Sequence, residues 1–476
     1  MTALIVACAL FMENLDGTVI STSLPAIALD LHEDPIALKL ALTSYLLSLA
    51  IFIPASGWAA DKFGARTVFR LAILVFTLGS IACGLSSTLP EFVAARVLQG
   101  MGGAMMVPVG RLVLLRSVER PEMVRALAYL TIPALIGPIV GPPVGGFITT
   151  YFHWRWIFWI NVPIGVLGIT LATIFIEDIR EANVWPLDLR GFLLSGIGLS
   201  LLIFGLSVAG RGVVPWAIIA SMMVLGGGAL ALYVWHARRT AYPILDLKLL
   251  RIRTFRASVT GGSLFRIATG SIPFLLPLML QIGFGMNAFQ SGLTTFISSA
   301  GAMAMKTTAP SILQTFGFRP VLIYNTLLSG LMLAAIGFFY PSTPTIVMMG
   351  VLLIGGFFRS LEFTSVNALA YADIESAVMS RATSFSSVAQ QLSLSLGVAI
   401  GASVLQTLRW FRGGTLEIAD FQWAFIVMAV ILMSAIASFI GLPEDAGSDL
   451  ARGTAAPGEP RSNQADPAPR KPLAKT

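Results

Sequence analysis

Charged residues are scarce in this sequence, and so are the residue types that build metal and nucleotide sites. Of the 476 residues, 12% are charged and 56% are hydrophobic, with a mean hydropathy of +0.81. The two cysteines, Cys8 and Cys83, lie in apolar runs and form neither a disulfide framework nor a metal pattern. No GxxxxGK motif is followed by Ser or Thr, so nothing indicates direct use of ATP. We therefore expect no metal and no cofactor, and the composition excludes an ordinary soluble domain.

Long polar stretches are equally rare. Apolar runs of about 20 residues, each long enough to cross a bilayer as a helix, recur along most of the chain. The runs are continuous rather than alternating, which predicts helices and not a barrel. We predict an all-α polytopic membrane protein with fourteen transmembrane helices. Their expected ranges are 2–29, 37–59, 67–86, 91–115, 124–150, 156–176, 189–208, 214–235, 257–282, 288–312, 320–340, 345–368, 384–408 and 421–442.

The distribution of Lys and Arg predicts the orientation. An even number of spans puts both termini on one side, and the segments of that side hold 21 of the 31 Lys and Arg residues. The loops of the opposite side hold 5. Because cytoplasmic loops are enriched in these residues, we expect both termini in the cytoplasm. The net charge of +7 then reflects attraction to anionic lipid, so no nucleic acid is required.

Four motifs occur in order on the first five spans. They are LDGT at 15–18, continuing to Leu24-Pro25; GWAADKFGAR at 57–66; RVLQG at 96–100; and GPIVGPPVGG at 137–146. Together they resemble the motifs of the fourteen-span drug:proton antiporters of the major facilitator superfamily (EmrB/QacA-like), over residues 1 to about 442. The runs PASGW at 54–58 and GGAMMVPVGRL at 102–112 resemble the MdtD-type branch more closely still.

The resemblance implies two six-helix halves with two extra helices between them. The expected division is residues 1–183 for the N-terminal bundle, 184–236 for the inserted helices, 237–256 for a cytoplasmic linker, 257–442 for the C-terminal bundle and 443–476 for a disordered cytoplasmic tail. Repeat symmetry between the halves should leave a trace. Gly317-Phe318-Arg319-Pro320 after the tenth span echoes Gly64-Ala65-Arg66 after the second.

Glycine patterns predict close helix packing and a tight turn. Gly137, Gly141 and Gly145 recur every four residues, so they share one helix face that another helix can approach closely. Gly64 permits a tight turn. Asp61 at that helix end either pairs with the other half, as the resemblance implies for a latch, or belongs to a solvated loop. The residues expected to act in gating are Gly57, Asp61, Gly64, Arg66, Gly137, Gly141, Pro142, Gly145 and Gly146.

Charges at bilayer depth in the first half suggest proton coupling. Asp16 lies midway along the first span, and Glu13 is one turn away on the same face. Buried carboxyls are costly and usually functional, and a carboxyl that takes up a proton near neutral pH is what proton antiport needs. Arg96 lies inside the fourth span and, by resemblance, joins the proton path. The alternative for Asp16 and Arg96 is a purely structural ion pair.

The second half carries unusual cations. Arg266, Lys306 and Arg359 lie within spans, and Glu362 is expected to neutralise Arg359 on the same helix. We expect these four residues and Gln99, on the fourth span, to line a substrate cavity. The cavity would have an anionic wall on the first span and a cationic wall opposite. Such a cavity favours an anionic or zwitterionic substrate. In the alternative interpretation, the cations pair with the first-span carboxyls across the halves and hold a closed state.

These features predict a proton-coupled efflux transporter, an antiporter of the multidrug type that works by alternating access. We expect it in the cell inner membrane as a monomer, with a small-molecule substrate, protons and the lipid bilayer as its partners. One alternative is an exporter of an organic anion or a metal chelate. Another is a membrane receptor without transport activity. No nucleophile–base pair or metal cluster supports an enzyme.

Overall fold

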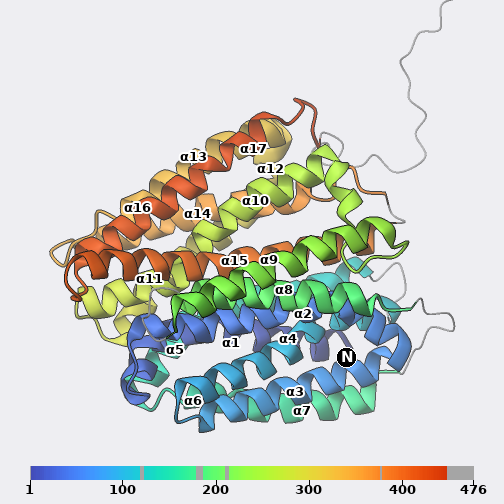
Figure 1. The fold of residues 1–476 in the computed structure, drawn as a ribbon, viewed down its shortest axis with the longest axis horizontal. Coiled ribbons are helices and arrows are strands. Elements are labelled where there is room, and N and C mark those ends of the chain that lie inside the picture. The colour runs from blue at the N-terminus through green and yellow to red at the C-terminus, as the bar shows by residue number, and fades with distance from the viewer. Residues whose placement is uncertain (1, 118–122, 178–185, 209–213, 376–377, 448–476) are drawn as a thin grey trace, which may run out of the picture.

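Long helices run side by side along the long axis of the molecule in the computed structural model (Figure 1). The structure describes residues 2–117, 123–177, 186–208, 214–375 and 378–447, and these contain helices and turns but no β-strand. Arg120, Arg180, Arg211 and residues 448–476 of the predicted tail lie outside the described residues. The all-α prediction is therefore confirmed for the part of the chain that is described.

The N-terminal helices cover the first six predicted spans. They are α1 (Thr2–Asp30), the 3₁₀ turn η1 (Pro35–Leu38), α2 (Lys39–Phe63), α3 (Ala65–Leu85), α4 (Leu89–Ser117), α5 (Met123–Tyr151), α6 (Trp156–Trp159) and α7 (Asn161–Phe175). The sixth predicted span is thus divided into a one-turn helix and a longer one. Two further helices follow, α8 (Leu189–Val208) and α9 (Trp216–Arg239), and then the 3₁₀ turn η3 (Leu247–Arg251).

The C-terminal helices cover the last six predicted spans. They are α10 (Arg253–Gly270), α11 (Ile272–Leu278), the π-helical turn η4 (Met279–Gly283), α12 (Ala288–Phe316), α13 (Phe318–Ile336), α14 (Thr345–Leu369), α15 (Met379–Phe411), α16 (Ile418–Ser434) and α17 (Ile436–Ile440). The ninth predicted span is therefore broken into three pieces. The thirteenth, expected at 384–408, is extended at both ends as α15.

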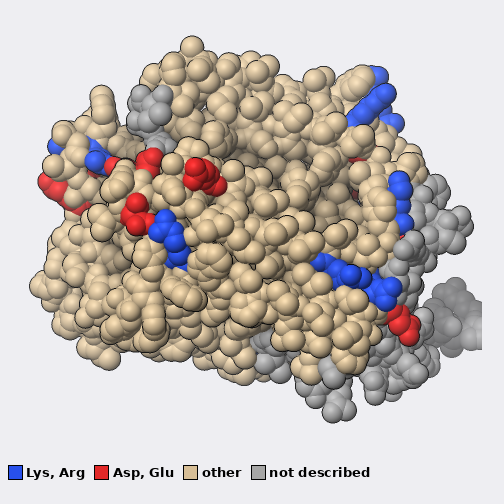
Figure 2. All heavy atoms as spheres, turned by 90° about the horizontal axis from the view of Figure 1, so that it is seen from below, with Lys and Arg blue, Asp and Glu red and all other residues tan. Residues whose placement is uncertain are grey.

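Twelve helical stretches in the described residues are long and apolar enough to cross a membrane. α5 and α12 occupy two further predicted ranges but are not among the twelve; α12 is rich in Ser and Thr, which lowers its hydropathy. Figure 2 shows that, on the face seen there, charged side chains gather at the two ends and leave a wide uncharged belt between them. A belt of this kind fits a hydrocarbon core, because charged side chains are costly there. The chain is a multi-pass membrane protein.

The bundle has two ends, named here after residues that lie at them. α1 ends at the Asp34 end, and α2 returns from there to the Gly64 end. The early helices and the late helices lie in different parts of the bundle (Figure 1), and α2 packs against α15 and α5 against α12. α8 packs against α9 and also touches both α2 and α15. The two parts of the chain therefore meet along paired helices.

Two single glycines make the turns that the sequence predicts. Gly64 alone separates α2 from α3, with φ 92° and ψ 132°. Gly317 alone separates α12 from α13, with φ 74° and ψ 169°. Positive φ values of this kind are open to glycine and strained for other residues. The echo between the two sequence segments therefore corresponds to the same backbone device at two equivalent places.

We expect Gly317→Ala to destabilise the protein by about 1–3 kcal/mol, because its backbone conformation is essentially restricted to glycine. A methyl group at Gly317 meets open space, so backbone strain is the sole source of the effect. Thermal unfolding of the detergent-solubilised protein should show a lower melting temperature. Gly350→Ala is the matched control, since Gly350 lies inside α14 with open space and without positive φ. Equal melting temperatures for the two variants would contradict this account.

Candidate functional site

A buried polar cluster surrounds Asp16 in the N-terminal part of the bundle. Arg96 Nη1 donates to Asp16 Oδ2 at 2.7 Å, and Gln99 Nε2 and Asn161 Nδ2 donate to Asp16 Oδ1 at 2.8 and 2.9 Å. Ser80 joins the cluster by accepting from Gln99 at 2.8 Å. The carboxylate, guanidinium and amide come from α1, α4 and α7, and all are buried. Asp16 thus accepts hydrogen bonds from three donors, one of which is the cationic guanidinium of Arg96.

The guanidinium of Arg96 is held from several sides. Its Nε donates to the carbonyl oxygen of Ala41 at 3.3 Å, and its Cζ lies 4.1 Å from the ring centroid of Tyr45. Arg96 Nη1 also donates to Gln99 Oε1. Among the described residues Arg96 Nη2 has no acceptor. A charge that is fully buried and anchored in this way ties α2 and α4 to α1.

Glu13 lies outside this cluster but is connected to it. Tyr45 Oη donates to Glu13 Oε1 at 3.4 Å, so the tyrosine that stacks on Arg96 also reaches the second carboxyl. Glu13 lines a cavity of about 420 Å³, together with Arg111 on α4, Asn367 on α14 and Gln390 on α15. We call it the Glu13 cavity. It lies between the two parts of the bundle. Arg111, which lines it, is near the C-terminal end of α4, and this places the cavity towards the Gly64 end.

A second cavity lies beside the first and is lined by two of the three expected cations. Lys306 on α12 and Arg359 on α14 line it, with Thr18 on α1 and Pro142 on α5 on the facing side, and its volume is about 380 Å³. We call it the Lys306 cavity. Phe363 lies on both cavities. The expected anionic and cationic walls therefore belong to two neighbouring cavities rather than to one.

Two of the expected cavity residues are engaged elsewhere. Arg266 faces the interior and is 3% exposed; its Nη2 donates to Asn367 Oδ1 at 2.6 Å, and its Cζ lies 5.5 Å from the ring centroid of Phe363. It lines neither cavity. Gln99 likewise belongs to the Asp16 cluster and lines neither cavity. Arg266, Lys306 and Arg359 form no ion pair with Asp16 or Glu13 among the described residues. The alternative interpretation, in which these cations pair with the first-span carboxyls across the halves, is therefore wrong for this state.

The expected pair of Arg359 and Glu362 is not formed, and this prediction is wrong. Arg359 Nη2 donates to Ser298 Oγ on α12 at 2.8 Å. Glu362 is turned towards α13, where it contacts Asn325 and Thr326. A spacing of three residues allows an ion pair but does not require one, because each side chain found a partner on a different neighbouring helix.

The glycine stripe packs as predicted. A methyl group at Gly137, Gly141 or Gly145 would press against α1, at Asn14, Thr18 and Val19 respectively. One at Gly146 would press against the backbone of α12. The carbonyl of Pro142 in turn lies against Gly292 of α12. α5 therefore contacts α1 on one side and α12 on the other, so it lies directly between the two parts of the bundle.

The other gating candidates lie at the Gly64 end. Gly57 and Asp61 are in the second half of α2, and Gly64 follows that helix. Arg66 Nη1 donates to the carbonyl oxygen of Ile176, just after α7, at 3.3 Å. These positions tie the turn to α7. A latch that involves Asp61 stays a prediction.

Side-chain contacts between the two parts of the bundle gather at the Asp34 end. Asp34 forms an ion pair with Arg409, and Lys39 Nζ donates to Gln406 Oε1 at 2.8 Å. Gln281, in the π-helical turn η4, donates to the carbonyl oxygen of Thr22 at 2.9 Å. The backbone N–H of Phe289 donates to Thr150 at 3.1 Å. The Asp34 end is therefore bridged by polar contacts beyond the two cavities.

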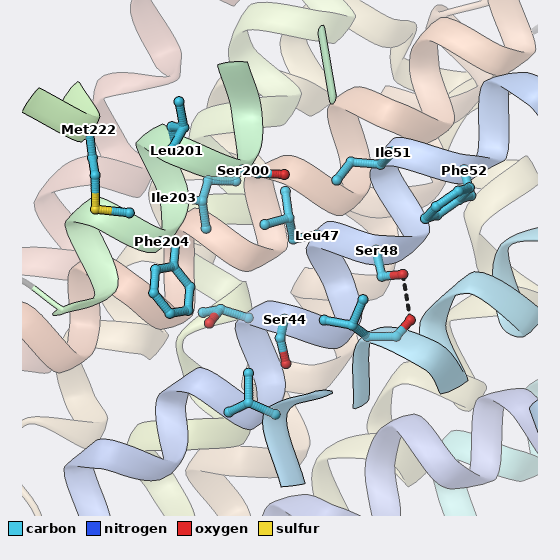
Figure 3. A pocket seen from close by; sticks show the side chains of 13 residues that line it. Ser44, Leu47, Ser48, Ile51, Phe52, Ser200, Leu201, Ile203, Phe204 and Met222 are labelled. Carbon is cyan, nitrogen blue, oxygen red and sulfur yellow. Dashed lines mark hydrogen bonds between the residues drawn. The ribbon is translucent and has the colours of Figure 1, made fainter. Parts of the chain in front are cut away.

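A third cavity, of about 280 Å³, lies between α2, α4, α8 and α9. Figure 3 shows Leu47, Ile51 and Phe204 turned into it, and it marks the hydrogen bond of Ser48. That hydroxyl donates to the carbonyl oxygen of Val97 at 2.7 Å. The described residues that line this cavity carry no charge. It lacks a group that could hold a charged substrate, so the two cavities between the bundle parts remain the stronger candidates.

Apart from Gln99, sequence reasoning missed the uncharged members of the site. Asn161 and Ser80 complete the Asp16 cluster, Tyr45 links it to Glu13, and Asn325 and Thr326 contact Glu362. The available signal was a polar side chain inside an apolar span, since such groups need partners at bilayer depth. That signal finds Asn161 and Asn325, but Ser and Thr can also bond their own helix backbone and so give little warning.

Comparisons with known proteins agree with this architecture. The family model described as Major Facilitator Superfamily matches residues 6–398. A protein of Shigella boydii serotype 4 is 38% identical over 461 residues, which cover 94% of this chain and 95% of that protein. A protein of Salmonella paratyphi A is 38% identical over 456 residues, with the same coverage. Both carry the name "Putative multidrug resistance protein MdtD".

Solved structures show the same fold at low sequence identity. A D-xylose-proton symporter superposes with a TM-score of 0.67 at 16% identity and covers 94% of this chain and 98% of its own. A POT family transporter in complex with 5-aminolevulinic acid gives a TM-score of 0.68 at 14% identity, with 91% and 94% coverage. The family model over residues 6–398 and the relatives at 38% identity show that the chain belongs to the Major Facilitator Superfamily and is a transporter.

Proposed function

We propose that this protein exports small molecules across the cell inner membrane in exchange for protons, by alternating access. The observation that carries the proposal is the connection from the Glu13 cavity through Tyr45 to the buried pair of Asp16 and Arg96. A carboxyl that faces a cavity between the two parts of the bundle can exchange protons with solvent in one state. The name shared by the relatives supports export of the multidrug type.

The finer architecture belongs to the same proposal. We take α5 and α12 as spans in addition to the twelve, which gives fourteen. Residues 1–183 and 257–442 then form six-helix halves, with 184–236 inserted and 237–256 as linker. The packing of α8 against both α2 and α15 supports an insertion beside the halves rather than within one. The excess of Lys and Arg supports cytoplasmic termini, and we propose that one chain suffices for transport.

In this proposal the described state is closed at the periplasmic side. With the termini in the cytoplasm, the Asp34 end faces outward, and the contacts of Asp34, Lys39 and Gln281 bridge the halves there. Substrate enters from the cytoplasm into the two cavities. Protonation of Glu13, together with the Asp16 pair, changes the relative stability of the inward- and outward-facing states. The inward- and outward-facing states must bind the proton with different affinities, since otherwise protonation does not change their relative populations.

A second candidate function is export of an organic anion or metal chelate. Lys306 and Arg359 line the Lys306 cavity, and neither forms an ion pair among the described residues. A negatively charged group in that cavity would gain two cationic partners. A lipophilic cation would instead be repelled there and would bind nearer to Glu13. The two candidates therefore differ in which cavity holds the substrate charge.

For Asp16→Asn we expect loss of flux driven by an imposed pH gradient in proteoliposomes. The substitution also leaves Arg96 buried without its counter-charge, which costs about 3–5 kcal/mol of stability. Ethidium flux, with and without the gradient, measures the coupling. Thermal unfolding of the same samples measures the stability.

The double variant Asp16→Asn with Arg96→Gln separates coupling from folding. It removes both charges, so we expect stability to recover towards that of the wild type, because no uncompensated charge remains. Coupling should stay lost. Recovery of gradient-driven flux in this double variant would show that Asp16 serves only as the structural partner of Arg96.

The Lys306→Gln variant tests the anion alternative. If the cavity holds an anion, the carboxyfluorescein concentration that gives half-maximal flux should rise about fivefold. That change corresponds to roughly 1 kcal/mol, the value of an exposed charge pair. Ethidium flux should stay unchanged or rise. Lys248→Gln in η3 is the matched control, because it removes the same charge away from both cavities. An equal effect on both probes, or on neither, would count against an anion site.

A further inference from the structure

A buried carboxyl between α13 and α14 has no role in the proton path described above. Glu362 is completely buried and lines neither cavity between the halves. Its Oε2 is 2.8 Å from Asn325 Nδ2, and its Oε1 is 2.8 Å from Thr326 Oγ1. Both partners lie on α13 and are buried as well. Among the described residues, the hydrogen-bond partners of Glu362 are therefore uncharged.

The hydrogen bonds around Glu362 can be counted proton by proton. Asn325 Nδ2 carries two protons, which serve the carbonyl oxygen of Phe358 at 2.9 Å and Glu362 Oε2. Thr326 Oγ1 carries one proton but has two oxygen neighbours, the carbonyl of Leu322 at 2.5 Å and Glu362 Oε1 at 2.8 Å. Four contacts thus share three protons from Asn325 and Thr326. An ionised Glu362 supplies none, so one contact would lack a hydrogen.

The distances show where the extra proton belongs. Two oxygens 2.5 Å apart repel each other unless a hydrogen lies between them, so the Thr326 hydroxyl donates to its own helix at Leu322. The contact between Thr326 Oγ1 and Glu362 Oε1 then needs a proton from the carboxyl. A neutral Glu362 that donates to Thr326 and accepts from Asn325 satisfies all four contacts.

No nearby cation opposes this assignment. The charged groups on the helices packed against α14 are Lys306 on α12, Arg319 on α13, and Arg253, Arg256 and Arg266 on α10; Arg359 lies on α14 itself. Arg319 pairs with Glu444, Arg266 bonds to Asn367 and Arg359 bonds to Ser298. None of them forms an ion pair with Glu362 in the described part of the chain. Burial without a counter-charge favours the neutral acid.

We infer that Glu362 is a second, reversible proton-binding site, located in the C-terminal half and loaded in the described state. Its part in the transport cycle rests on the proposed function. Arg359 lies one turn before it on α14, within reach of an i, i+3 ion pair. When the halves rock and Arg359 leaves Ser298, Glu362 gains a cation and releases one proton as it becomes a carboxylate. Arg359 is the positioning residue that sets the charge of Glu362.

Infrared spectroscopy of the full chain in liposomes tests the proton itself. The difference spectrum of wild type against Glu362→Gln at neutral pH should contain the C=O stretching band of one protonated carboxyl group per chain. Raising the pH should remove that band. Thr326→Val should shift it upward in frequency, because the carboxyl O–H loses its acceptor. A difference spectrum with carboxylate bands at neutral pH, or no shift in Thr326→Val, overturns the assignment.

Transport with ethidium and carboxyfluorescein tests whether that proton is exchanged during the cycle. Glu362→Gln preserves the shape and the hydrogen bonds of the neutral acid, so exchange of labelled for unlabelled probe at equal pH should continue. Flux driven by a pH gradient should lose part of its coupling, seen as fewer protons moved per probe molecule. Glu444→Gln is the matched control, since Glu444 is 93% exposed and outside the halves' interior. An unchanged proton ratio in Glu362→Gln overturns the role in the cycle.

The two arms keep this inference apart from the proposed function. If the wild type moves neither probe under a pH gradient, the exporter function with these substrates fails, whereas the infrared result still decides whether Glu362 holds a proton. If the wild type is coupled and the infrared band is absent, only the Glu362 site fails. Normal melting temperatures for Glu362→Gln and Thr326→Val ensure that each reading comes from a folded chain.

Discussion

The interior of the N-terminal half depends on one buried ion pair, that of Asp16 and Arg96. Taking two charges out of water is costly, and the cost is recovered only if the pair is close and its remaining groups are hydrogen-bonded. Gln99, Asn161 and the Ala41 carbonyl supply those bonds. This requirement fixes the rotation of α1, α4 and α7 relative to one another. It ties these helices into one packed unit.

The contacts between the two halves are of a different kind from the buried ion pair. Where α5 lies between α1 and α12, glycines allow close backbone contact along most of the interface. The hydrogen bonds between α5 and α12 are few, such as those of Phe289 with Thr150 and of Ser299 with the carbonyl oxygen of Pro138. At the Asp34 end the contacts are polar and include Lys39 and Arg409. Packing of smooth glycine faces tolerates sliding and rocking, whereas polar contacts are made or broken. A bundle built in this way can pivot on α5 while it exchanges the polar contacts of one end.

Much of the fold could be predicted from the sequence because its signals are local. Apolar runs mark the helices, and the turns at Gly64 and Gly317 follow from the backbone freedom of glycine. The site was predicted less well. The direction in which a side chain points depends on how its helix is rotated about its axis. Hydropathy does not determine that rotation when every face of the helix is apolar. For that reason Arg359 and Glu362, three residues apart, were expected to pair but contact different helices. The charged members of the Asp16 cluster and Gln99 were named from the sequence, whereas Asn161 and Ser80 were not.

The sign of coupling connects the two carboxyl sites to the substrate. Proton exchange requires that substrate binding weaken proton binding, and by linkage the reverse also holds. A cationic substrate beside Glu13 achieves this, because it repels a proton there and stabilises the carboxylate. An anionic substrate that takes Arg359 keeps this cation away from Glu362, and so it favours the protonated acid. An anion and the Glu362 proton would then be bound in the same state, which opposes exchange. If the substrate is an anion, its exchange for protons must therefore depend on Glu13 and the Asp16 pair rather than on Glu362.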